Sequence, residues 1–187
     1  MLRCPWVPVG DALYEAYHDH EWGVPVHSDA VLFEFLVLES AQAGLSWRTI
    51  LGRREGYRAA FAGFDPHIIA TWGEEKIDEL AQDARIIRNR AKIKATINNA
   101  KRFLEVAQEF GSFANYLWKF VDGKPIDGHK KTLGDYVATT PISDALAKDM
   151  KKRGFSFFGS TVAYAHMQAV GMVNDHTEGC DRYRALL

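Results

Sequence analysis

The chain's only two cysteines lie almost at its opposite ends, and each has a histidine at a spacing suited to metal ligation. Thirteen residues separate Cys4 from His18, and three separate His176 from Cys180. Two cysteines and two histidines make a closed tetrahedral ligand set, which is typical of structural zinc. Two alternatives remain open from spacing alone: a disulfide between the cysteines, or two unrelated thiols with His18 at the surface.

A carboxylate interrupts the apolar stretch FEFLVLESAQAGLSW at residues 33–47. Glu39 follows four consecutive apolar residues, and on a helix it would share a face with Gln42. A buried carboxylate without a partner is costly. Glu39 is therefore expected either to find a partner inside the protein or to bind a ligand.

Aromatic residues are plentiful near the N-terminus and recur at the end of this stretch. They are Trp6, Tyr14, Tyr17, Trp22 and Trp47. Aromatic side chains at helical spacing belong to a core more often than to a ligand site. The nearby carboxylate of Glu39 makes a ligand site more plausible here. Aromatic rings favour a positive charge and a carboxylate accepts N–H donors, so the set suits a flat cationic ligand such as an alkylated purine base.

Basic residues are concentrated in RIIRNRAKIKATINNAKR, residues 85–102, which holds seven Lys or Arg and no acid. A smaller basic cluster occupies 148–153, whereas residues 1–40 are acidic, with Arg3 as their only Lys or Arg. The net charge of −1 and the pI of about 6.7 argue weakly against a nucleic-acid partner. This uneven distribution could nevertheless place phosphates on one face. A solvated helix face explains the first cluster equally well.

The elements that must position these residues are mostly helices. Capping residues and apolar periodicity predict helices at residues 28–43, 46–51, from 65 onward, and at 74–82, 93–107, 112–120, 143–154 and 160–170. Ser143 is the predicted cap of the seventh helix and Gly154 its stop. The buried stripe of the long central helix is predicted to run from Ile93 to Leu104 and Ala107. Residues 122–141 are predicted to be a long connection.

The length of 187 residues suits one domain, and 47% hydrophobic residues with 25% charged residues are typical of a soluble globular protein. No apolar run is long enough for a membrane span, and no secretory signal is apparent. We therefore expect a cytoplasmic protein with reduced cysteines, which disfavours the disulfide. The chain also lacks the motifs of serine hydrolases, zinc proteases and nucleotide-binding proteins.

Five segments together resemble the DNA-3-methyladenine glycosylase I family. They are RCPWV at 3–7, YHDHEWGVP at 17–25, LESAQAGLSWRTIL at 38–51, KKRGFSFFGSTVAYAHMQAVGMVNDH at 151–176, and the final Cys180. The resemblance is collinear and covers essentially the whole chain. Each segment alone would be a weak signal, but the combination is specific.

The resemblance implies an all-α domain of the helix-hairpin-helix glycosylase type over residues 1–187, with one zinc ion tying its ends together. It implies a monofunctional glycosylase, expected to be a monomer without membrane association. Such an enzyme excises 3-methyladenine, and less efficiently 3-methylguanine, from alkylated double-stranded DNA. The free base is its product, and an abasic site remains.

The resemblance also assigns roles by position. The zinc ligands would be Cys4, His18, His176 and Cys180. The base pocket would contain Glu39, Tyr17 and Trp47, with Tyr14 and Trp6 nearby. Leu45 would enter the gap left by the flipped nucleotide, and Arg85, Arg88 and Arg90 lie nearest the hairpin that binds DNA.

One departure from the family pattern falls on this hairpin. The family resembles DAGIIRHRGKI where this chain has DARIIRNRAKI at residues 83–93, so Arg85 and Ala91 replace two glycines. Backbone N–H groups hold a phosphate best in a tight, unhindered turn. Either the turn tolerates side chains, or part of the phosphate contact has moved onto Arg85.

The expected mechanism relies on the substrate, because N3-methylation makes the base a cationic leaving group. Glu39 is expected to recognise that cation once the nucleotide is flipped, and water then attacks the sugar. Two rival functions remain: a non-enzymatic module that binds alkylated bases, and a metal-dependent hydrolase using His18 and His20. The second requires an open coordination position, which a set of two Cys and two His does not leave.

Overall fold

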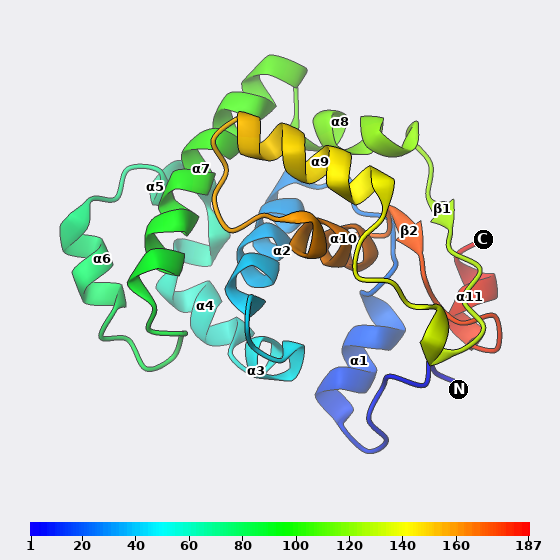
Figure 1. Cartoon of the computed structure of the whole chain (residues 1–187). Coiled ribbons are helices and arrows are strands. Elements are labelled where there is room, and N and C mark those ends of the chain that lie inside the picture. The colour runs from blue at the N-terminus through cyan, green and yellow to red at the C-terminus, as the bar shows by residue number, and fades with distance from the viewer.

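The computed structural model describes all residues from 1 to 187, and its regular structure is almost entirely helical (Figure 1). The α-helices are α1 (Ala12–His20), α2 (Asp29–Gln42), α3 (Trp47–Leu51), α4 (Arg54–Ala60), α5 (Pro66–Ile69), α6 (Glu74–Leu80), α7 (Arg90–Phe110), α8 (Phe113–Trp118), α9 (Pro141–Lys152), α10 (Ser160–Ala169) and α11 (Asp181–Ala185). Short 3-10 helices occupy η1 (Ala62–Phe64), η2 (Lys119–Val121) and η3 (Leu133–Asp135), and the strands are β1 (Ile126–Asp127) and β2 (Val173–Asn174). None of the helices combines the length and apolar composition needed to cross a bilayer.

Helix α2 lies at the centre of the fold, packed against α3, α7, α8 and α10 (Figure 1). All of its residues from Leu32 to Ala41 are buried, as expected for a helix that is apolar on most sides. Gly44 follows the helix with a φ of 78°, which a side chain would strain. The first residue of the helix, Asp29, accepts hydrogen bonds from the N–H groups of Phe113 and Ala114, both at 2.8 Å, and so caps α8.

Helix α7 confirms the strongest predicted periodicity but differs in its buried face. Ile93 and Ile97 are buried as predicted, whereas Leu104 is only half-buried. The inward positions of the second half are instead Phe103 and Val106. The ring of Phe103 stacks on Phe113 of α8 at a centroid distance of 4.2 Å, which explains the rotation of the buried face.

Helix α9 starts earlier than predicted, because Ser143 is not its N-cap. The N-cap is Thr140, whose side chain accepts a hydrogen bond from the N–H of Ser143 at 3.2 Å. The hydroxyl of Ser143 accepts one in return from the N–H of Thr140 at 2.8 Å, completing a capping box with Pro141 at the first helical position. Gly154 ends the helix region with a φ of 89°, as predicted.

The predicted connection at 122–141 supplies one of the two short strands that depart from an all-helical architecture. Strand β1 pairs in parallel with β2, with Ile126 opposite Val173. The N–H groups of Ile126 and Gly128 donate to backbone carbonyls of the 172–174 segment at 2.9 and 3.0 Å. This short pairing brings the middle of the chain to its C-terminal region, where the backbone of Leu2 also pairs with Asp181.

Candidate active site and metal cluster

A cavity of about 360 Å³ opens between the N-terminal segment, α1, α2, α3, η3 and α10. Its lining residues are Trp6, Tyr14, Tyr17, Trp22, Glu39, Gln42, Trp47, Leu133, Tyr136, Ala165 and Gln168. All five predicted base-pocket residues therefore line the same cavity, although they come from four separate segments of the chain. The cavity is mostly aromatic, with a single carboxyl group.

Glu39 is 4% exposed, and no hydrogen bond or ion pair engages its carboxyl group. Burial alone raises the pKa of Glu39 from 4.5 to about 8. The group is therefore mostly protonated at neutral pH while the cavity is empty. A cationic ligand would favour its ionised form, because opposite charges attract strongly in a desolvated site.

The aromatic walls pack on one another around Glu39. The ring centroids of Tyr17 and Trp47 are 5.3 Å apart, and those of Trp6 and Tyr14 are 5.7 Å apart. The indole N–H groups of Trp6 and Trp47 are buried without a hydrogen-bond partner. Burial raises the pKa of Tyr14 and Tyr17, so both hydroxyls stay protonated. The cavity thus offers flat apolar faces, one carboxyl group and unpaired donors.

Leu45 lies on the turn between α2 and α3, and its side chain is 40% exposed. It lines a depression that shares Glu39, Gln42 and Ala165 with the Glu39 cavity. Ser46 caps α3 through the N–H of Thr49 at 3.2 Å, as predicted. The turn therefore presents Leu45 beside the cavity mouth.

Several lining residues were not singled out from the sequence as pocket residues. Gln42 could have been, because it lies one helical turn from Glu39. Trp22 belongs to the aromatic set but had no assigned role. Leu133, Tyr136 and Gln168 carry no local signal, because the contacts that bring them to the cavity depend on distant parts of the chain.

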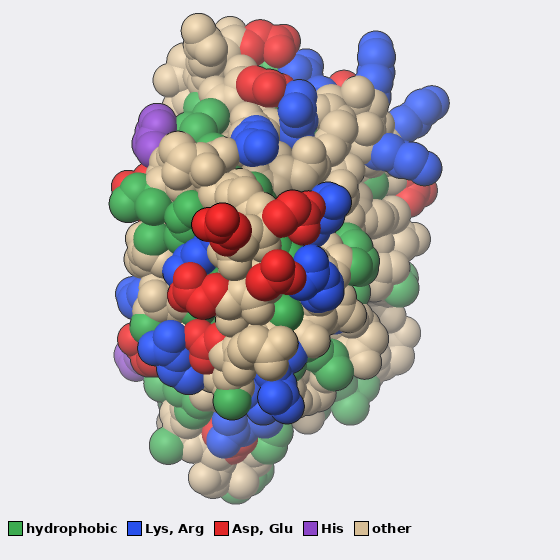
Figure 2. Space-filling view, turned by 90° about the vertical axis from the view of Figure 1, so that its left-hand side faces the viewer, with side chains coloured by type: hydrophobic (Ala, Val, Ile, Leu, Met, Phe, Trp, Pro, Cys, Tyr) green, Lys and Arg blue, Asp and Glu red, His purple; other side chains and the backbone are tan.

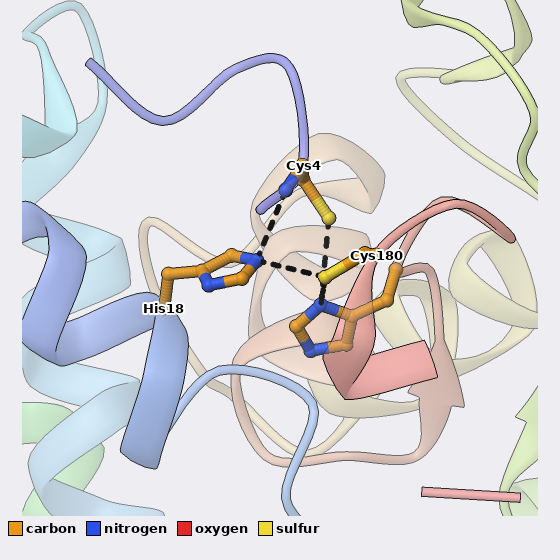
Figure 3. Close-up of side chains that lie close together, drawn as sticks. Cys4, His18 and Cys180 are labelled. Atoms are coloured by element: carbon orange, nitrogen blue, oxygen red, sulfur yellow. Dashed lines mark hydrogen bonds between the residues drawn. The ribbon is translucent and has the colours of Figure 1, made fainter. Parts of the chain in front are cut away.

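The four predicted metal ligands converge on one buried cluster (Figure 3). The ligand atoms of Cys4, His18, His176 and Cys180 all lie within 4.8 Å of one another. The Sγ of Cys180 is 3.5 Å from His18 Nε2 and 3.5 Å from His176 Nδ1. Tetrahedral zinc with ordinary bond lengths separates its sulfur and nitrogen ligands by about 3.5 Å. Both cysteines are free thiols, not a disulfide.

Hydrogen bonds to the far side of each imidazole support a metal-binding tautomer. The Nδ1 of His18 lies 2.8 Å from the Asp19 carboxylate, and the Nε2 of His176 lies 3.0 Å from the carbonyl of Trp22. These oxygens can only accept, so each of those nitrogens carries the proton. Lone pairs then remain on His18 Nε2 and His176 Nδ1, which face the cysteines. Arg3 in turn binds Asp19 and lowers its pKa to about 2.

His20, considered above as part of a catalytic metal site, is exposed and lies outside the cluster. The four-ligand set fits a closed structural metal site. The structure therefore lends no support to the metal-dependent hydrolase.

The predicted DNA-binding stretch is less uniformly positive in space than in sequence. Figure 2 shows acidic and basic side chains intermixed on the face where Figure 1 places α4 to α6. Arg85 forms an ion pair with Asp83 at 2.7 Å, and Arg90 pairs with Asp78 of α6. Of the three predicted hairpin arginines, Arg88 alone is exposed without an ion pair.

Lys92, also within this stretch, binds backbone carbonyls of the protein and is not free to contact a phosphate. Its Nζ donates to the carbonyls of Ala41 and Ala43 at 2.8 and 2.6 Å, which satisfies the C-terminal end of α2. Helix α7 is thereby tied to the turn that carries Leu45.

The hairpin between α6 and α7 does not require the glycines that the family pattern contains. Neither Arg85 nor Ala91 has a positive φ, so each position accommodates a side chain. The glycine that matters here is Gly56 of α4, because a Cβ at that position would lie 2.5 Å from the carbonyl oxygen of Arg85. Arg53 donates to the carbonyl of Ala84 at 2.7 Å and helps α4 hold the hairpin.

The sequence profile described as methyladenine glycosylase matches residues 6–183. The chain is 50% identical over 183 residues to DNA-3-methyladenine glycosylase 1 of Escherichia coli strain K12, covering 98% of this chain and 97% of that protein. The chain belongs to the methyladenine glycosylase family.

Solved structures of the methyladenine glycosylase family have the same fold. A crystal structure of 3-methyladenine DNA glycosylase I matches with a TM-score of 0.93 and 52% identity, covering 96% of this chain and 98% of that one. A variant of 3-methyladenine DNA glycosylase I in complex with 3-methyladenine matches with a TM-score of 0.91 and 36% identity, covering 92% and 93% of the two chains. The helical architecture expected from the resemblance is thus confirmed.

Proposed function

We propose that this family member is a DNA-3-methyladenine glycosylase, which hydrolyses the N-glycosidic bond of 3-methyladenine in alkylated DNA and leaves an abasic site. The observation that carries the proposal is the unpaired, buried carboxyl group of Glu39 in an aromatic cavity. Folding has left this group without a partner, and a cationic base supplies one. Release of 3-methylguanine is expected to be less efficient.

In the proposed reaction the damaged nucleotide leaves the duplex and enters the cavity. Flipping is cheaper for an alkylated base, because it stacks and pairs poorly. Tyr17 and Trp47 contact its faces, and Trp6 and Tyr14 complete the aromatic enclosure. Leu45 is positioned to fill the gap that the nucleotide leaves.

Glu39 distinguishes the lesion from normal adenine by charge. When the cationic base enters, it stabilises the ionised carboxylate, and the proton of Glu39 leaves to solvent. A neutral adenine cannot offset the cost of ionising a buried carboxyl group in the same way. The bond from the base to C1′ breaks with its electron pair on the base, which departs neutral; water adds to the oxocarbenium-like sugar and loses a proton to solvent. No lysine lines the cavity, so strand cleavage through an imine is not part of the proposal.

We infer that the four-ligand cluster holds one zinc ion with a structural role. Two thiolates and two neutral imidazoles are a preferred zinc set, and their buried arrangement leaves no position for water or substrate. The bound ion would tie the N-terminal segment and α1 to the residues before α11. Trp22, which lines the cavity, also accepts from His176 through its carbonyl, so the metal site would support one cavity wall.

Duplex binding is proposed to use the hairpin before α7. Arg88 is free to contact a phosphate, whereas Arg85 and Arg90 must first leave their carboxylate partners. At the N-terminal end of α7, the Asn89 side chain caps the N–H of Lys92, and the N–H groups of Arg90 and Ala91 remain unpaired, with a helix dipole that favours an anion.

The decisive experiment is incubation of the protein with methylated duplex DNA, followed by chromatographic identification of released bases. Release of free 3-methyladenine, with an intact but abasic strand, is expected. Tight binding of the damaged duplex without any released base would favour the non-enzymatic lesion-binding module instead.

A further inference from the structure

The exposed segment from Lys131 to Thr139 forms part of the cavity mouth. Tyr136 is the only residue between these two that is not exposed. Two large apolar side chains project from the segment, Leu133 at 56% exposure and Val137 at 48%. Leu133 lines the Glu39 cavity, and Val137 does not. Single exposed apolar side chains are ordinary, so the position of Leu133 at the cavity is what distinguishes it.

Local hydrogen bonds fix the turn that carries Leu133. The carboxylate of Asp135 accepts from the N–H groups of Lys131 and Thr132 at 2.9 and 2.7 Å, forming a capping box around η3. The hydroxyl of Tyr136 donates to the backbone carbonyl of Asp175 at 2.9 Å. The turn is therefore fastened on both sides of Leu133.

The fastened turn directs Leu133 toward the aromatic wall. Residues three apart on a 3-10 turn lie on the same side, which explains why Leu133 and Tyr136 both line the cavity. Figure 1 shows η3 across from α1, the helix that contributes Tyr14 and Tyr17 to the same cavity. The segment is anchored just before its start by the bridge between Lys130 and Thr177, where the N–H of Glu178 donates to the Lys130 carbonyl at 2.7 Å.

We propose that Leu133 is a further base-binding residue, which closes over the flipped 3-methyladenine and becomes buried against it. The proposal rests on the function proposed above and adds a residue to its substrate site. Burying a half-exposed leucine favours the bound state. It also displaces water near Glu39, which strengthens the attraction between the carboxylate and the cationic base.

Calorimetric titration with free 3-methyladenine tests this assignment on the intact protein. Leu133→Ala should weaken binding by roughly fivefold to tenfold, because the apolar cover is lost. Leu133→Met should stay within about twofold of the wild type, because it restores the apolar volume. Val137→Ala is the matched control on the same exposed segment and should bind as the wild type does. All three variants should unfold at the wild-type temperature, since both positions are exposed.

Equal affinities for Leu133→Ala and Val137→Ala would overturn the proposal. The two possible failures are distinguishable by the wild-type protein. If it binds and releases 3-methyladenine while Leu133→Ala behaves identically, only the role of Leu133 is wrong. If the wild type neither binds the base nor releases it from DNA, the proposed function fails and this inference fails with it.

Discussion

Glu39 is a carboxyl group that folding removes from water without supplying a hydrogen bond or a counter-charge. Such a residue lowers the stability of the empty protein at neutral pH and stabilises the complex when a cation binds. Stability and recognition therefore oppose each other at this position, which makes Glu39 testable in two independent ways.

The first prediction concerns stability. Below pH 4.5 the Glu39 carboxyl group is protonated in both the folded and the unfolded chain. Between pH 4.5 and about 8 it ionises only in the unfolded chain, so the free energy of unfolding declines as pH rises. Glu39→Gln removes this titration. Its free energy of unfolding should exceed that of the wild type by an amount that grows from pH 5 to pH 8, with an upper limit of about 5 kcal/mol.

Denaturant titrations of both proteins at pH 5 and pH 8 measure this difference. Glu55→Gln is the control, because the Glu55 side chain is 84% exposed and should show no comparable pH dependence. A stability difference between Glu39→Gln and wild type that is the same at both pH values would contradict the prediction.

The second prediction concerns recognition by the same residue. A hydrogen bond to a charged group contributes about 1.5 to 3 kcal/mol, so Glu39→Gln should weaken binding of 3-methyladenine roughly ten- to a hundredfold. The variant should nevertheless remain folded. Calorimetric titration measures the loss, and unchanged affinity would show that Glu39 does not read the base.

At the scale of elements, α4 and α6 decide what the basic hairpin can do. Helix α6 brings Asp78 to Arg90, and Asp83 beside the hairpin binds Arg85. The backbone of the hairpin lies so close to α4 that only a glycine fits at position 56. Neighbouring residues therefore determine which hairpin arginines are free to bind phosphate, and α4 determines where the hairpin backbone lies.

The third prediction separates the hairpin arginines. Each phosphate contact removed lowers the slope of log affinity against log salt concentration by about 0.9. Arg88→Ala should show this loss, and Arg90→Ala a smaller one because the Asp78 ion pair competes with phosphate. Arg85→Gly should leave the slope nearly unchanged, because Arg85 is paired with Asp83. Salt-titrated anisotropy with an abasic duplex gives the slopes. Identical slopes for wild type and all variants would place the DNA elsewhere, most directly on the basic cluster at 148–153.

The fourth prediction tests the packing between α4 and the hairpin. Gly56→Ala forces the Arg85 backbone to move, which should cost about 1 to 3 kcal/mol of stability and weaken duplex binding. Binding of free 3-methyladenine should be preserved, since the cavity is elsewhere. Gly73→Ala is the matched control, because a Cβ there meets open space. If duplex affinity and stability are unchanged in Gly56→Ala, the close approach has no role in positioning the hairpin.

At the scale of the whole molecule, the two ends of the chain depend on each other. The ligand cluster joins Cys4 to Cys180, and paired backbone groups of Leu2 and Asp181 lie beside it. A metal at this point closes nearly the entire chain into one loop, which restricts the unfolded state most when the loop is long.

The fifth prediction follows from this closure. Elemental analysis should find about one zinc per chain. Cys180→Ser should lose the metal and several kcal/mol of stability, which corresponds to roughly 10 °C in melting temperature for a chain of this length. His20→Ala, on the same helix as His18 but outside the cluster, should keep both. A chain stripped of zinc that melts at the wild-type temperature would rule out the structural role.

The features that the sequence predicts well are those formed by residues close together along the chain. Helices at Ser46, Asp65 and Ser112 begin where their caps indicate, because capping and i to i+4 bonding involve neighbouring residues. Gly44 and Gly154 likewise mark real helix ends. The burial of Glu39 was also predictable, since an apolar run surrounds it in the sequence itself.

The Thr140 cap was also a local signal, because Pro141 and the capping box with Ser143 lie within the same four residues. Tertiary structure decided the rest, because it depends on groups distant along the chain. Helix α7 turns Phe103 inward because Phe113 of α8 packs against it. Residues 85–102 contain no acid, but the fold places Asp78 of α6 against Arg90. Leu133 reaches the cavity mouth only through long-range strand pairing and the Tyr136 contact, neither of which leaves a local pattern in the sequence.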